Sequence, residues 1–448
     1  MIQAVRDILR DRSIRVAYLM CLMLGVAYGI VMAIVAIYLN KERGFAETTI
    51  GGLAFFFSAG IAIFAIPMGM LVRVLSPRIM LSVALIGYGV ATAVFPFLTT
   101  FAALATARAI DGAFSVGAWI SIETILLMRT TALNRGFVTS LYSIVLAIGY
   151  VIGSVFAAGW THFAPSASAF VCAGVLAIGA AIVGLMRLDR ELHPVAGSDH
   201  AHEAGTTGSH ATLGATLPGA EPAAGKPAIG ALRLYWNIKT ACFTTFTYGY
   251  FQGSLVLFLP LFLIDHRGVA EGPTKLLVAF FAAGMALTVV FMGRLGDRHG
   301  HLKTIRALVA IGAVITVSVV YLPWFPVVAA VVFLAGGVLA PVYPLSIALQ
   351  SIIAEPRDYN RSNALLNVSY ALGTLAGPLI CGYLYDTYSR GPNGTKVPFG
   401  GELLFWQLAA LWALVFVMTM AFRRDDPSLR RRRASASRTG PAPRTPAQ

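Results

Sequence analysis

Most of this chain consists of long apolar runs separated by short polar segments. Each run is long enough to cross a hydrocarbon core of ~30 Å as a helix, which takes ~20 residues. Backbone polar groups in lipid must be hydrogen-bonded within their own segment, and the runs are too uniformly apolar for barrel strands. The pattern therefore predicts an all-α integral membrane protein with twelve transmembrane helices. They cover about 14–38, 49–72, 78–97, 99–127, 137–160, 166–187, 234–264, 274–293, 303–322, 325–353, 361–385 and 401–422.

The apolar pattern repeats at an offset of 224 residues. Of the eighteen glycines in residues 1–190, eight fall on another glycine at that offset, where chance predicts about two. Two like-oriented halves predict two pseudo-symmetric six-helix bundles, a plan typical of transporters whose site lies between the halves. The pairs are Gly25/Gly249, Gly29/Gly253, Gly44/Gly268, Gly60/Gly284, Gly69/Gly293, Gly112/Gly336, Gly149/Gly373 and Gly153/Gly377.

Two segments interrupt or follow the repeat. Residues 1–187 and 230–422 are predicted to form the two bundles. Residues 188–229 are rich in Gly, Ala, Thr, Ser and Pro, which is typical of a disordered linker. The histidines of this linker match no metal-binding spacing, so no metal site is predicted. Residues 423–448 form a basic tail in which Arg430–Arg433 either bind anionic lipid or serve only to fix the topology.

Composition agrees with a lipid environment. The chain is 57% hydrophobic and 12% charged, with a mean hydropathy of +0.74, whereas soluble domains carry roughly 25% charged residues. The net charge of +14 does not indicate nucleic-acid binding, because the charges lie at helix ends and in the tail. All four cysteines lie inside apolar runs and are interpreted as small core residues.

The positions of Lys and Arg predict the orientation. Of 34 such residues, 27 lie on the side that holds both termini, six lie in the opposite loops, and Arg108 lies within a run. Positive charge favours the cytoplasmic side, so both termini are predicted to be cytoplasmic, in a plasma (inner) membrane. The first apolar run is longer than the apolar region of a signal peptide, which has ~7–15 residues, and is interpreted as an uncleaved helix.

The loop between the eighth and ninth runs carries a specific motif. It reads Gly-x-x-x-Asp-Arg-x-Gly, with Gly293, Asp297, Arg298 and Gly300 at the fixed positions. This loop resembles the signature of the major facilitator superfamily, and the resemblance covers both halves. It implies that two bundles rock about a midplane site formed mainly by helices 1, 4, 7 and 10.

The equivalent loop of the first half departs from that signature, because Arg73 stands at the acidic position, followed by Arg78. We therefore expect cytoplasmic charge pairs with the polarity exchanged. The alternative is that these arginines only mark the cytoplasmic side and have no partner. The expected pairs are Arg73 or Arg78 with Glu355 or Asp358, and Asp297 with Arg135.

Charged residues inside the runs are candidates for function. Arg108 and Asp111 fall in an Arg-x-x-x-Gly motif that resembles the family's fourth helix, and their spacing of three places them on one helix face. Each costs ~2.5–3.5 kcal/mol at a helix centre. Asp111 either carries a proton, with Arg108 contacting substrate, or the two form a permanent structural ion pair. Glu123 is either a second proton site or a partner of Arg129 or Arg135.

Small residues at a spacing of four suggest close helix contacts. Gly149 and Gly153, and Gly373, Gly377 and Pro378, allow two backbones to approach. The second set resembles the element that antiporters of the superfamily carry in helix 5, but helix 5 of this chain has no proline after Gly153. These residues are interpreted as packing and hinge elements.

Aromatic and amide side chains form a third candidate group. Such a mixed lining suits an amphiphilic organic ligand, although single aromatic residues often serve only helix packing. The candidates are Tyr28, Trp119, Phe246, Tyr250, Gln252, Tyr343, Asn367 and Tyr370.

Together these features predict a monomeric secondary transporter of a small organic solute, with proton-coupled efflux by alternating access. No Walker loop is present, so ATP is not expected to drive transport, which leaves an ion gradient or facilitated diffusion. Protons are favoured because Asp111 and Glu123 are the acids within the runs, and no cofactor is expected. An integral-membrane enzyme would need a cluster of His, Asp or Ser within the apolar runs, and the sequence contains no such cluster. The alternatives are proton-coupled uptake of an anionic metabolite, in which Arg108 binds the anion, and a transporter-like receptor without flux.

Overall fold

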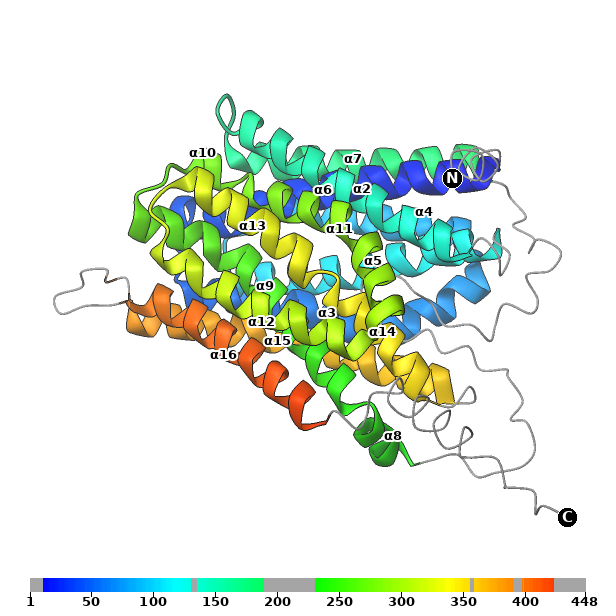
Figure 1. The fold of residues 1–448 in the computed structure, drawn as a ribbon. Coiled ribbons are helices and arrows are strands. Elements are labelled where there is room, and N and C mark those ends of the chain that lie inside the picture. Colours follow the sequence, from blue (N-terminus) through cyan, green and yellow to red (C-terminus); the bar gives the residue numbers. More distant parts are fainter. Residues whose placement is uncertain are drawn as a thin grey trace, which may run out of the picture.

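The computed structural model describes residues 11–129, 135–188, 230–354, 358–389, 397 and 399–422. These residues are helical with short connections and contain no strand (Figure 1). Twelve helices of the described part are long and apolar enough to cross a membrane, as the sequence predicts. The predicted linker, apart from Leu188, and the predicted tail lie outside the described residues.

The first half begins where Asp11 caps a helix by accepting a hydrogen bond from the backbone N–H of Ser13 at 2.8 Å. Six long helices and two short segments follow. They are α2 (Arg12–Ile37), η1 (Tyr38–Glu42), α3 (Glu47–Leu75), α4 (Pro77–Val94), η2 (Phe95–Phe97), α5 (Phe101–Met128), α6 (Arg135–Trp160) and α7 (Ser166–Arg187).

The second half has the same plan of spans and differs in its short elements and in one divided span. A short helix, α8, precedes its first span, and the run predicted over 325–353 is divided at Pro341, which cannot donate the backbone hydrogen bond a continuous helix needs. The elements are α8 (Ala231–Asn237), α9 (Lys239–Arg267), α10 (Glu271–Thr274), α11 (Leu277–His299), α12 (His301–Tyr321), α13 (Phe325–Leu339), α14 (Val342–Ile353), α15 (Tyr359–Tyr388) and α16 (Phe399–Ala421).

Repeated glycines mark the helix crossings within each half. A Cβ atom on Gly60 would stand closer than 3.0 Å to the carbonyl oxygen of Ala109, and one on Gly284 equally close to that of Phe333. Gly153 approaches Val26 in the α2–α6 crossing as Gly377 approaches Tyr250 in the α9–α15 crossing. Because each contact recurs at an offset of 224, the sequence repeat reflects two bundles built with the same crossings.

An arginine fixes the equivalent turn in each half, and we call its contacts with a ring and a backbone carbonyl the arginine clasp. Arg43 lies over the ring of Tyr38 at 5.8 Å and donates to the carbonyl of Pro96 at 3.0 Å. Arg267 lies over the ring of Phe262 at 5.6 Å and donates to the carbonyl of Val320. All three positions of one clasp lie 224 residues from those of the other. These charged groups are thus used to fix turns.

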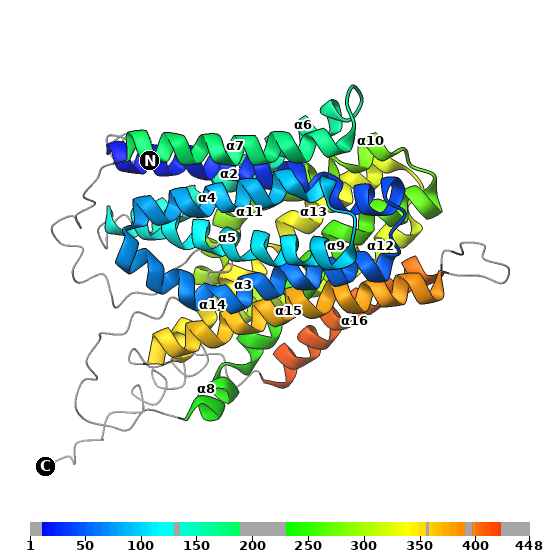
Figure 2. The same cartoon turned by 180° about the vertical axis from the view of Figure 1, so that it is seen from behind.

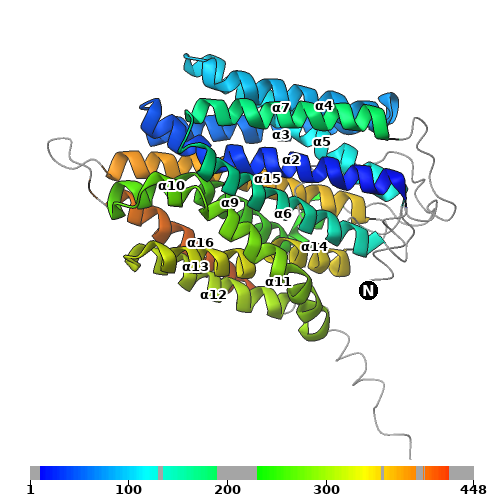
Figure 3. The same cartoon turned by 90° about the horizontal axis from the view of Figure 1, so that it is seen from above.

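The two bundles lie side by side, with their helices running in roughly the same direction (Figure 3). Helix α3 runs beside α15, and α6 contacts α11, so two symmetry-related helix pairs join the halves (Figures 2 and 3). We call the end that carries the start of α2 and helix α8 the terminal end, and the end that carries η1 and α10 the far end (Figure 1).

Large apolar side chains cover the outer surface of both bundles. Ile63, Leu287 and Val314 are 66%, 72% and 70% exposed. Such a surface is unfavourable in water and matches the hydrocarbon core of a bilayer, where helix association depends on close packing.

The glycine crossings generate a stability prediction. Gly60→Val and Gly284→Val should each lower the free energy of unfolding by about 1–3 kcal/mol, because the added atoms meet a backbone carbonyl. Thermal unfolding in detergent would measure it. Gly179→Ala is the matched control, since its Cβ would meet only a flexible methionine end at 3.8 Å. Equal stability of all three variants would contradict the assignment.

Candidate functional site

A cavity of about 140 Å³ lies between the two bundles. Helices α2, α3, α4, α5 and α6 supply its wall from the first half, and α9 and α15 supply the wall from the second. The first, fourth and seventh spans thus contribute as expected. The tenth span contributes no residue to the wall that the described part of the chain forms.

An ion pair within α5 occupies the wall of the cavity. Arg108 Nη1 contacts Asp111 Oδ2, and Ser115 donates to the other carboxylate oxygen at 3.3 Å. The guanidinium also lies 4.3 Å from the ring centre of Phe57 on α3. Asp111 is 4% exposed. The geometry therefore joins the two charges and holds both against the cavity rather than against lipid.

Aromatic side chains form the neighbouring part of the wall. Tyr28 lies between Tyr88 and Trp119, with ring centres at 4.9 and 5.6 Å and near-parallel planes, and Tyr150 meets it edge-on at 6.3 Å. The indole N–H of Trp119 has no hydrogen-bond partner among the described residues. A buried donor without a partner costs about 1–3 kcal/mol, so an acceptor on a bound solute would be stabilised here.

The second half faces this wall with uncharged polar groups. Tyr370 on α15 donates to Gln252 Oε1 on α9 at 2.9 Å, and both side chains line the cavity. Ser58 on α3 donates to the carbonyl of Thr374 at 3.2 Å and thereby joins the halves at the rim. The first-half wall thus carries the charged pair and most of the aromatic rings, whereas the second-half wall is uncharged, with a few polar groups among apolar residues.

Four predicted lining residues lie outside this wall. Tyr343 donates to Asn367 Oδ1 at 2.9 Å in the core of the second half. Tyr250 accepts from Gln407 at 2.9 Å, and Phe246 stacks on Phe243. Their role in binding stays a prediction.

Comparison with known proteins identifies the architecture. The family model described as Major Facilitator Superfamily matches residues 17–272 and 241–447, which together span both bundles. The chain belongs to the major facilitator superfamily. The protein is therefore a membrane transporter, as the family indicates, and a multi-pass membrane protein.

Two relatives with similar sequences come from bacteria. An uncharacterised MFS-type transporter of Yersinia pestis (strain Pestoides F) is 26% identical over 308 residues, or 69% of each chain. One of Enterobacter sp. (strain 638) is 24% identical over 328 residues, covering 72% of this chain and 73% of the relative.

Solved structures of the superfamily share the fold. A bacterial homologue of the human lysosomal transporter Spinster, in an inward-facing occupied conformation, has a TM-score of 0.70 at 15% identity and covers 94% of this chain and 98% of its own. The nucleoside transporter NupG has a TM-score of 0.68 at 14% identity, covering 92% and 99%. The human organic anion transporter MFSD10 has 0.60 at 17%, covering 91% and 99%.

The superfamily signature loop lies at the terminal end of α11. Gly300 ends the helix with φ 97°, a conformation that glycine adopts without strain. Asp297 contacts His301 at 3.3 Å, and its side chain is 73% exposed. Arg298 is exposed, and a Cβ on Gly293 would meet nothing within 4 Å.

The expected cytoplasmic charge pairs stay a hypothesis. Arg78 donates to the carbonyl of Leu185 within its own half, and Asp358 contacts Arg361 at 3.3 Å within the other. The side chains of Arg73 and Arg135 and all of Glu355 lie outside the described residues.

The second candidate acid, Glu123, lies outside the cavity wall, nearer the terminal end of α5. Arg129, a partner considered from the sequence, contacts Asp11 at 3.5 Å.

Sequence reasoning did not select Phe57, Tyr88 or Tyr150 as site residues. Tyr88 and Tyr150 carry hydroxyl groups inside apolar runs, which was the available signal. No sequence signal points to Phe57, because only the three-dimensional position of Arg108 shows that the Phe57 ring faces a cation.

The α5 ion pair generates a test of its structural role. Asp111→Ala should lower the free energy of unfolding by about 3–5 kcal/mol, because Arg108 would remain buried without its counterion. The double variant Arg108→Met with Asp111→Leu should stay near the native value, since it removes both charges. Thermal unfolding in detergent measures both. A double variant as unstable as the single one would contradict this account.

Proposed function

We propose that this protein exports a small organic solute in exchange for protons by alternating access. The observation that carries the proposal is the buried Arg108–Asp111 pair in the wall of a cavity that both bundles line. In a membrane interior, such charges most often mark an ion or substrate pathway. A site shared by both halves can be exposed to either side when the halves rock.

Proton coupling follows from how Asp111 is held. The ionised carboxylate accepts from Arg108 and Ser115. A proton on Asp111 would weaken its attraction to Arg108 and change the polarity of the wall next to the aromatic stack. If this change lowers the affinity for the solute, bound solute must lower the affinity for the proton by the same factor, which is the condition for exchange.

The orientation of the protein belongs to the same proposal. The terminal end would lie in the cytoplasm and the far end outside, because most Lys and Arg residues lie on the side of the termini. The membrane would be the bacterial inner membrane, the functional unit a monomer, and the exchanged-polarity charge pairs would close the cytoplasmic side.

Uptake of an anionic metabolite is the second candidate. Arg108 supports it as a cation in the cavity wall. However, its guanidinium is already shared between Asp111 and the face of Phe57. An anion could bind it strongly only after Asp111 is protonated, so this route would move proton and anion in one direction.

Flux in liposomes tests the coupling. Asp111→Asn should reduce solute accumulation driven by an imposed pH gradient at least tenfold, because its side chain cannot carry the proton, whereas solute exchange without a gradient should persist. Glu123→Gln is the matched variant that probes a second proton site. A panel of neutral, cationic and anionic aromatic compounds would be screened.

The outcomes separate the candidates. Native pH-driven accumulation in Asp111→Asn and Glu123→Gln alike would contradict proton carriage by either acid. Accumulation of anions in the direction of the proton gradient, lost in Arg108→Ala, would favour uptake. Absence of flux for every compound and gradient would favour a receptor.

The unpartnered indole predicts a feature of the solute. Trp119→Phe should weaken binding of solutes with a carbonyl-type acceptor about tenfold more than binding of analogues without the acceptor, because the N–H donor is lost. The smaller phenyl ring reduces the stacking surface for both kinds of solute alike. Equilibrium binding with radiolabelled compounds measures this, and equal loss for both analogues would contradict it.

A further inference from the structure

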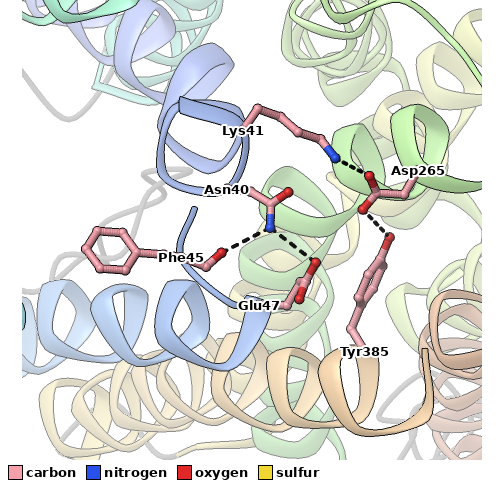
Figure 4. Close-up of polar contacts among 6 residues, drawn as sticks. All are labelled: Asn40, Lys41, Phe45, Glu47, Asp265 and Tyr385. Carbon is pink, nitrogen blue, oxygen red and sulfur yellow. Dashed lines mark hydrogen bonds and ion pairs between the residues drawn. The ribbon is translucent and has the colours of Figure 1, made fainter. Parts of the chain in front are cut away.

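A polar cluster at the far end joins the two halves directly. Lys41, at the end of η1, forms an ion pair with Asp265 in the last turn of α9, and Tyr385 of α15 donates to the second carboxylate oxygen at 3.4 Å (Figure 4). The side chain of Asp265 is 5% exposed and that of Lys41 is 23% exposed. We call these three residues the axial cluster.

The position of the ion pair follows from the repeat. Lys41 and Asp265 lie 224 residues apart, so the quasi-twofold axis relates one position to the other. Two equivalent points are separated by twice their distance from the axis. A direct contact between them therefore places both side chains on the axis, where the two bundles meet.

The turn that carries Lys41 is held in place by its own half. Asn40 donates to the carbonyl of Phe45 at 3.1 Å and to Glu47 Oε1 at 3.2 Å (Figure 4). Arg43 adds the clasp to Pro96 described above. The lysine is thus aimed at the other half from a rigid support, which reduces the entropy lost when the pair forms.

Weaker contacts flank the axial cluster on both sides. Thr48 donates to Asp386 at 3.0 Å on the α3–α15 side, and Lys275 donates to Thr161 at 2.9 Å on the α6 side. Gly51 and Gly382 let the backbones of α3 and α15 approach, since a Cβ on either would stand closer than 3.0 Å to a carbonyl oxygen of the opposite half. These contacts need the far end to be closed.

We propose that Lys41 and Asp265 form a latch that holds the far end closed and sets the balance between far-closed and far-open forms in transport. Both act as positioning residues and need not touch the solute. When the bundles separate at this end, each charge leaves with its own half, so the pair contributes only to the far-closed form. This inference rests on the fold and is independent of the identity of the solute or of proton coupling.

The test measures the opening directly. Spin labels would be attached at Phe163→Cys and Trp324→Cys, which are 92% and 71% exposed at the far end of opposite halves, with the four native cysteines replaced by serine. Pulsed electron–electron distance measurements in lipid nanodiscs, without solute, give the fraction of far-open molecules. Asp265→Asn and Lys41→Met should each raise the ratio of far-open to far-closed molecules about tenfold or more.

The symmetry of the two positions supplies a rescue variant. Exchanging the charges, as Lys41→Asp with Asp265→Lys, should return the ratio to near the native value, because each new side chain occupies the position equivalent to its original one. Thr48→Ala is the matched control and should shift the ratio less than Asp265→Asn, since it removes an uncharged partner away from the axis.

Three results would overturn the latch. They are an unchanged distance distribution in both folded single variants, a shift in Thr48→Ala as large as in Asp265→Asn, or a charge exchange that opens the far end as far as the single variants do. Because the readout is a distance without solute, failure to find any transported compound would leave it intact. Loss of the monodisperse protein in one single variant would leave the other single variant and the exchange to decide.

Discussion

Close approach of helix backbones is the constraint on which this structure depends. In lipid, apolar side chains gain nothing by leaving the solvent, so helices associate through van der Waals contact at points where glycine lets backbones approach. These points recur at equivalent positions in the two halves, as Gly60 and Gly284 show. Each half is packed within itself at such crossings, and the pairs α3–α15 and α6–α11 pack the two halves against one another around the shared cavity.

The cavity concentrates charge where the two halves meet. Arg108 and Asp111 neutralise one another on one helix, and Phe57 covers the guanidinium from a second helix. A neutral pair costs less in a membrane than either charge alone, yet it can still respond to a proton. The same pair thus satisfies the requirement of folding and supplies a group that can titrate. The aromatic stack beside it offers flat apolar surface and an unused indole donor to a solute.

Sequence patterns predicted the architecture in detail because each pattern can be recognised along the chain itself. Runs of apolar residues determine spans, and glycine pairs at an offset of 224 determine crossings. The sequence predicts one span over 325–353, whereas the structure divides it at Pro341 into α13 and α14. Six of the residues proposed for the site line the cavity, whereas Tyr250 and Tyr343 turn to partners in the second-half core, since helix rotation decides which face of a span meets the cavity. Lys41 was interpreted only as a loop charge, because no sequence pattern shows that a residue lies on the symmetry axis.

The axial ion pair also disfavours the pairing of either half with a copy of itself. A symmetric pair of two first halves would bring Lys41 against its own copy, and a pair of two second halves would bring two carboxylates together. Like charges on a twofold axis repel, so neither half is suited to self-association, whereas the unlike combination is favoured. If the chain arose by duplication of a half that once paired with itself, opposite charges at these two positions record the step after which only the fused, unequal arrangement could close.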